Sequence, residues 1–211
     1  CMGAMAQSGT NSPYSQYGLG VMSDQTAGFN RGMNGLGLGF REHNQVNFLN
    51  PASYSAVDSL TFIFDVGFSG QLTNFKENGT KKNAKNADFE YAVASFRACK
   101  NLGVSFGILP YTNIGYSYSN TGKISGDATN IYSNTFYGEG GLHQVYLGAG
   151  WQILNGLSVG ANFGYLWGDY TKSVTNAYSD SYVKTITKIY TANVTNYKID
   201  FGAQYQFKAG K

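Results

Sequence analysis

The sequence predicts an all-β protein: an antiparallel transmembrane β-barrel, or the N-terminal part of one with about six long strands here, preceded by an N-terminal hatch or plug segment. Three observations lead to this fold class. Aromatic residues make up 16% of the 211 residues, whereas charged residues make up 13%, well below the roughly 25% of soluble domains. Residues 59–73 alternate apolar and polar side chains almost without interruption. Short and long connections then alternate between further segments of this kind.

Six segments show the period of two that is typical of a strand whose faces meet different surroundings. They are residues 59–73, 88–98, 102–119, 142–153, 157–167 and about 190–207. Strict alternation puts Tyr91 and Val93 on the same face as Phe89, and Ile114 on the same face as Ile108. The polar segments 74–87, 120–139 and 168–188 are expected to be long loops, as on the outer side of a membrane barrel, and the other two connections are short turns.

The apolar rows face either lipid or a protein core between two sheets. The residues opposite these rows are mixed, sparse in charge and often glycine, which suits the lumen of a barrel better than a face in bulk water. Tyr and Trp gather toward strand ends, as in an aromatic girdle. Lipid is therefore favoured, and strands in lipid must belong to a closed barrel. Because known bacterial barrels have at least about eight strands, we expect the C-terminal half to be missing, unless the loops hide two strands and the barrel is a small complete one.

The chain divides into three predicted parts. Residues 1–6 end in Ala4-Met5-Ala6 and fit the remnant of a signal peptide, the alternative being a vector-derived leader. Residues 7–58 are rich in glycine yet too apolar for a disordered linker, so we expect a hatch or plug inside the barrel. Residues 59–211 are expected to form the barrel strands.

The sequence contains no pattern that predicts an enzyme, a metal site or a cofactor. His43 and His143 lack Cys or carboxylate neighbours at ligand spacing. The net charge of +3, without a basic cluster among aromatics, argues against nucleic acid as a partner.

Three stretches, residues 12–20, 32–40 and 47–67, resemble the FadL-like outer-membrane transporters of the Bacteroidetes kind, as do residues 141–169. In that family an N-terminal hatch with an Asn-Pro-Ala motif plugs the barrel, and Asn50-Pro51-Ala52 match this motif just before the first strand. The resemblance implies a channel of the bacterial outer membrane for passive uptake of hydrophobic molecules such as long-chain fatty acids. The implied partners are outer-membrane lipid and a hydrophobic small-molecule ligand, and the implied barrel is monomeric.

Two further expectations concern the route of such a ligand. A kink in the third strand opens the barrel wall sideways in that family, and Pro110, with Gly107 and Gly115, predicts a break there because proline lacks a ladder donor. The alternative for Pro110 is a simple bulge. The expected lining consists of Phe29, Met33, Leu36, Leu38, Phe40, Ile63, Leu109 and Tyr111, although each could instead pack the hatch against the wall.

Two other functions stay open. One is a FadL-like barrel that does not transport but acts as a binding or secretion-shuttle protein. The other is a small structural barrel of the outer membrane.

Overall fold

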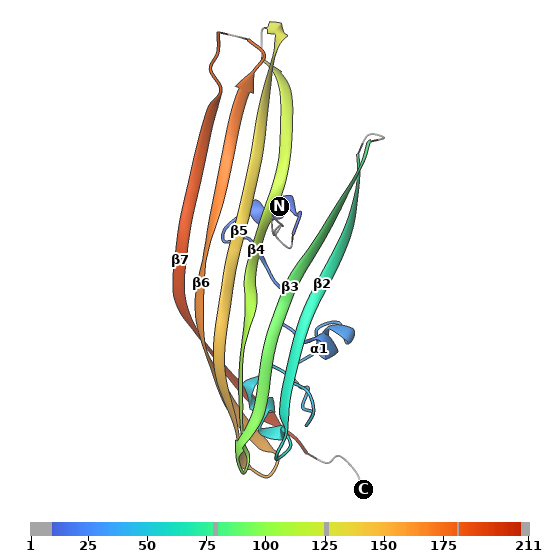
Figure 1. The fold of residues 1–211 in the computed structure, drawn as a ribbon, viewed down its shortest axis with the longest axis vertical. Coiled ribbons are helices and arrows are strands. Elements are labelled where there is room, and N and C mark those ends of the chain that lie inside the picture. Colours follow the sequence, from blue (N-terminus) through green and yellow to red (C-terminus); the bar gives the residue numbers. More distant parts are fainter. Residues whose placement is uncertain (1–9, 78–79, 125–126, 181, 208–211) are drawn as a thin grey trace, which may run out of the picture.

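The computed structural model describes residues 10–77, 80–124, 127–180 and 182–207, so the predicted signal remnant lies outside the described residues. One antiparallel sheet dominates the fold, in the order β2-β3-β4-β5-β6-β7, with β1 paired to β4 (Figure 1). No other strand pairs with the outer edges of β2 and β7 in the described part, so the sheet is open. The elements are η1 (Pro13–Gln16), β1 (Val21–Met22), α1 (Gly28–Gly32), η2 (Pro51–Ala56), β2 (Phe62–Glu77), β3 (Thr80–Cys99), β4 (Leu102–Ile124), β5 (Asp127–Leu154), β6 (Leu157–Tyr178) and β7 (Ile186–Tyr205).

The all-β, antiparallel part of the predicted fold class is confirmed, with six long strands. A closed barrel is not what the structure contains. No described helix is long and apolar enough to cross a membrane.

The prediction that three polar segments form long loops is wrong, because most of their residues extend the strands. β2 and β3 continue through residues 74–77 and 80–87, β4 and β5 through 120–124 and 127–139, and β6 and β7 take up much of 168–188. Threonine and tyrosine favour strands even without an apolar face, and hydroxyls pair across neighbouring strands. Thr175 and Thr187 are one such pair, with Oγ1 atoms 3.0 Å apart.

The outer face of the sheet, turned away from the N-terminal segment, carries apolar side chains in cross-strand rows. Three rows run across all six strands, and together we call them the apolar belt. They are Phe62, Phe96, Val104, Ala149, Ala161 and Phe201; Phe64, Ala94, Phe106, Leu147, Phe163 and Ile199; and Val66, Ala92, Ile108, Val145, Tyr165 and Tyr197. The belt is exposed, with Phe64 at 66% and Leu147 at 60% of their full accessibility.

Two bulges overturn the strict alternation that the sequence suggested. The register of β2 with β3 shifts at Gly67/Phe68, so Phe89 faces outward beside Phe68 while Tyr91 is buried on the inner face. The register of β4 with β5 shifts between Pro110 and Thr112, so Ile114 is buried although Ile108 faces outward. An extra residue in one strand reverses the facing of every later residue in that strand.

The sheet splits next to the second bulge. Pairing between β3 and β4 ends at Ala92 and Ile108, although both strands run on. Figure 1 shows β2 and β3 leaning away from β4–β7 beyond this point. Pro110 therefore lies where the split begins.

Four glycines form a row on the inner face, one from each of β4–β7. The row consists of Gly103, Gly150, Gly160 and Gly202, which are direct partners in register. η2 lies on this row so closely that a Cβ on any of the four would overlap with Asn50, Pro51 or Tyr54. We call these residues the glycine row.

Adding one methyl group to the glycine row should loosen the N-terminal segment. Gly160→Ala places its Cβ against the backbone of Pro51 and Ala52, and overpacking of this kind costs about 1–3 kcal/mol or more. We expect a lower denaturant midpoint for the purified full-length protein and faster proteolysis within residues 10–58. Ala161→Val, on the outer face next along β6, is the control. Equal midpoints and cleavage rates for the two variants would contradict the role of the row.

Candidate functional site

The candidate site is the inner face of the sheet together with residues 10–58, which cover it. The Asn50-Pro51-Ala52 motif begins η2. The Asn50 side-chain oxygen accepts a hydrogen bond from the Ala52 N–H at 3.1 Å, and its amide nitrogen donates to the carbonyl oxygens of Leu38 at 2.8 Å and Ala203 at 3.3 Å. Proline suits the first position of a helical turn, where its missing N–H leaves no bond unmade. The motif thus builds the turn that sits on the glycine row.

Tyr54 fastens this turn to the sheet through buried polar contacts. Its hydroxyl donates to the side-chain oxygen of Asn162 at 3.0 Å, and Asn162 donates through its amide to the Phe48 carbonyl at 3.3 Å. The hydroxyls of Ser105 and Tyr146 lie 2.9 Å apart beside them. Burial raises the pKa of the Tyr54 phenol well above its ordinary value, so the phenol stays protonated and keeps its role as a donor.

A small apolar core lies between the segment and the sheet. Phe48 is at its centre, with its ring centroid 6.0 Å from those of Tyr91 and Tyr146. Leu109 is fully buried in this cluster, and Ile63 packs against it. One of these two predicted lining residues is therefore part of the apolar core between the N-terminal segment and the sheet, and the other lies at its border.

The other six predicted lining residues are dispersed. Phe29 and Phe40 contact each other on the N-terminal segment, with ring centroids 5.0 Å apart and the rings tilted by 34°. Leu36 and Leu38 are about 70% exposed on that segment, and Met33 is half-buried. The Tyr111 ring lies under the Lys198 ammonium at 5.5 Å. The eight residues are not brought together around one cavity.

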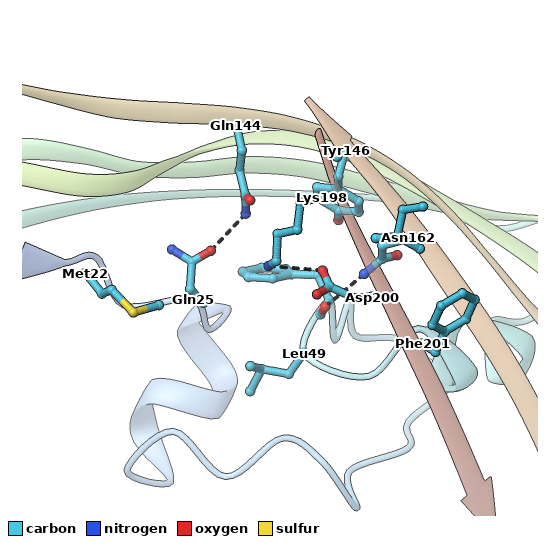
Figure 2. Close-up of a pocket in the computed structure, with 12 residues that line it drawn as sticks. Met22, Gln25, Leu49, Gln144, Tyr146, Asn162, Lys198, Asp200 and Phe201 are labelled. Carbon is cyan, nitrogen blue, oxygen red and sulfur yellow. Dashed lines mark hydrogen bonds and ion pairs between the residues drawn. The ribbon is translucent and has the colours of Figure 1, made fainter. Parts of the chain in front are cut away.

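A cavity of about 610 Å³ does open on the inner face, between the N-terminal segment and β5–β7 (Figure 2). Its lining combines apolar side chains with amides and one ion pair, and none of the eight predicted residues belongs to it. The Gln144 amide nitrogen donates to the side-chain oxygen of Gln25 at 2.8 Å, and the Lys198 ammonium lies 3.0 Å from the Asp200 carboxylate. Sequence reasoning missed these residues, although Gln144, Lys198 and Asp200 stand opposite the apolar rows of their strands.

The N-terminal segment also covers the edge of β4 at the split. The buried Pro110 accepts a hydrogen bond at its carbonyl from the Gln25 amide at 3.0 Å, and Tyr111 accepts one from the Ser23 N–H at 3.0 Å. Gly115 donates its N–H to the Ser15 hydroxyl at 3.2 Å. Gly107 lies against Val93 of β3, below the split. The bulge at Pro110 is present, while a passage for a ligand there stays a prediction.

One ion pair and one hydrogen bond connect the segment to the other side of the split. The Arg31 guanidinium lies 2.8 Å from the Glu90 carboxylate of β3 and 3.4 Å from Asp24. The Gly28 N–H donates to the Tyr91 hydroxyl at 2.6 Å. No cluster of His, Cys, Asp and Glu able to hold a metal occurs in the part of the chain that is described.

Removing the Tyr54 hydroxyl should weaken the attachment of η2. Tyr54→Phe leaves the buried Asn162 oxygen without its donor, which costs about 1–3 kcal/mol. Denaturant unfolding of the full-length protein measures this loss. Tyr17→Phe, at a ring that is 68% exposed, controls for loss of a hydroxyl and should leave the midpoint unchanged. A Tyr54→Phe midpoint equal to that of Tyr17→Phe would contradict the assignment.

Comparison with known proteins corrects the expected identity. A family model described as BamG matches residues 1–211. No curated protein and no solved structure matches the chain.

The resemblance to FadL-like transporters is therefore wrong, and so are the expected uptake of hydrophobic molecules and the hydrophobic ligand. Neither of the other two expected functions is better matched. The motif that suggested FadL-like proteins, Asn50-Pro51-Ala52, serves a local purpose here, because it forms a tight turn against glycine backbone. The family supports one part of the expected location, namely association with the outer membrane. The chain, matched over its whole length, belongs to the BamG family.

Proposed function

We propose that this protein is an outer-membrane component that works with the β-barrel assembly machinery, the BAM complex. Its sheet forms a membrane-spanning wall from residues 59–211, and residues 7–58 act as a plug on the inner face. The role is structural and non-enzymatic, and it needs no cofactor. The observation that carries the proposal is the match of the whole chain to the BamG family, together with the apolar belt on the outer face.

The dimensions of the apolar belt support a position in lipid. On β5 the outward apolar side chains run from Trp151 to Val145, and His143 follows beside Trp167. This span approaches the roughly 9–11 tilted residues that cross a bilayer. Tyr165, Trp167 and Tyr197 lie at the upper border, as in an aromatic girdle. Exposed apolar surface of this extent is uncommon on monomeric soluble proteins.

The contacts on the inner face support the proposal that the N-terminal segment acts as a plug. Buried glycine and polar residues there are matched by specific contacts to the N-terminal segment, as at Tyr54 and Asn162. A lumen filled by its own chain needs such satisfied polar contacts.

The two ends of the sheet support an orientation. Tight turns join β3 to β4 and β5 to β6 at one end, whereas β4–β7 extend far beyond the belt at the other. Short periplasmic turns and longer outer parts are usual in outer-membrane barrels. The extension therefore belongs on the cell surface.

A charge placed on the apolar belt should harm insertion. We expect Leu147→Arg to destabilise the membrane-inserted protein by roughly 2–4 kcal/mol, because the middle of a bilayer disfavours arginine. Ile189→Arg is the matched control: it lies on the outer face above the belt and is 66% exposed, against 60% for Leu147. Folding into lipid vesicles at increasing urea measures both. Equal stability for the two variants would contradict a lipid-facing belt.

Association with the BAM complex is tested by purification. The full-length protein, tagged and extracted from native outer membranes in mild detergent, should retain BAM subunits in constant ratio. An unrelated outer-membrane barrel of similar abundance, with the same tag, is the control. Recovery of BAM subunits no higher than in the control would overturn the proposed function.

A further inference from the structure

Above the apolar belt the outer face of the sheet is polar and the inner face carries apolar rings, the reverse of the arrangement over the belt. We call residues 113–124, 127–142, 168–178 and 186–195 of β4–β7 the upper extension. Its outer face carries hydroxyls paired across strands, as at Ser119 and Thr135 at 3.0 Å. Its inner face carries aromatic rings instead: Tyr116, Tyr118, Phe136, Tyr170 and Tyr190.

Three of these rings have close neighbours that restrict their positions, and one of the three, Tyr116, is buried. Tyr118 stacks on Phe136 with centroids 5.0 Å apart and an interplanar angle of 18°. A Cβ at Gly138 would overlap with the Tyr116 ring, so glycine there makes room for it. A rigid arrangement lowers the entropy that a partner must overcome on binding.

The N-terminal segment braces the base of this surface. The Lys172 ammonium donates to the carbonyl oxygens of Gln16 at 2.8 Å and Gly18 at 2.9 Å, and it lies 4.9 Å from the centre of the Tyr170 ring. The Tyr118 hydroxyl donates to the side-chain oxygen of Gln16 at 2.6 Å. The surface is therefore continuous with the plug.

The chemistry of this surface fits protein better than sugar. Sugars stack on free ring faces, but the faces of Tyr118 and Phe136 cover one another. Tyrosine hydroxyls and edges, with asparagine and glycine between them, are instead typical of surfaces that bind protein.

The charged residues of this surface indicate the charge of the partner. Lys172 and Lys188 lie at inner positions of the register, whereas the carboxylates of Glu139 and Asp169 lie at outer ones. No Asp or Glu occupies an inner position in the described part of the upper extension whose side chains are placed. A positive inner face favours an acidic partner.

We propose that the inner face of the upper extension is a docking surface for an acidic segment of a protein partner. The inference rests on the proposed function in one respect, namely that the extension lies on the aqueous side of the membrane. The inference goes beyond the proposed function by specifying which face of the sheet binds the partner and the sign of the partner's charge.

Photo-crosslinking in cells tests the proposal with matched sites. The full-length protein carries p-benzoylphenylalanine in place of either Tyr190 or Ile189, adjacent residues of β7 that are 56% and 66% exposed on opposite faces. We expect one discrete protein adduct at position 190, about tenfold less at 189, and a net negative charge on the linked peptide. Lys188→Glu should lower the adduct at 190 by about tenfold or more, while Lys188→Arg should preserve it.

Several outcomes would overturn the proposal: equal adducts at both positions, no adduct, a protease-resistant adduct carrying lipopolysaccharide, a basic linked peptide, or indifference to Lys188→Glu. The outer-membrane fraction and the BAM recovery of the same cells are measured alongside. Retained BAM association without the adduct at 190 would remove the docking surface alone. Loss of BAM association from the unmodified protein would remove the proposed function.

Discussion

The close contact between η2 and the glycine row is the constraint on which the rest of the structure depends. Four strands must place glycine at the same level, because any side chain there would meet the backbone or side chains of residues 50–54. The turn must be tight, which Asn50 and Pro51 ensure. Once η2 lies on the row, Tyr54 reaches Asn162 and Phe48 reaches the apolar core. The sheet and the N-terminal segment are therefore fitted to each other through these contacts.

The distribution of apolar and polar side chains between the two faces of the sheet changes along its length. Over the belt the outer face is apolar and the inner face polar or small, whereas above the belt hydroxyls face outward and rings face inward. The bulge between Pro110 and Thr112 is where β4 makes this change. Pairing between β4 and β3 ends two residues earlier, at Ile108. The N-terminal segment bridges the split, because Gln25 donates to Pro110 of β4 and Arg31 pairs with Glu90 of β3. The N-terminal segment thus links the two parts of the sheet that the split separates.

Much of the fold could be predicted from the alternation of side chains, and the failures have physical causes. Strand cores such as residues 142–153 were evident because one face is apolar. The continuations of the strands were missed because hydroxyl-rich residues leave no apolar face to detect, although they pair well across strands. The bulge at Gly67/Phe68 was missed because register is a relation between strands that a single segment does not reveal. A break or bulge at Pro110 was predicted, but its effect on Ile114 was not.

The site was harder to predict than the fold. The glycine row could not be recognised in the sequence. Its members are brought into register only when the hairpins are aligned from their tight turns; they are Gly103, Gly150, Gly160 and Gly202. The likeness to FadL-like proteins drew in part on Asn50-Pro51-Ala52, and the purpose of this motif here is geometric, so the motif carried no information on a ligand. We propose that the belt faces lipid while the upper extension faces water. A nitroxide scan along β5 from residue 133 to residue 153, in the full-length protein reconstituted in vesicles, tests it most directly. We predict that odd positions from 145 to 153 are accessible to oxygen, whereas position 141 and the lower-numbered odd positions down to 133 are accessible to a water-soluble nickel chelate. Uniform access of the chelate to outward positions along the whole strand would show that the belt does not face lipid.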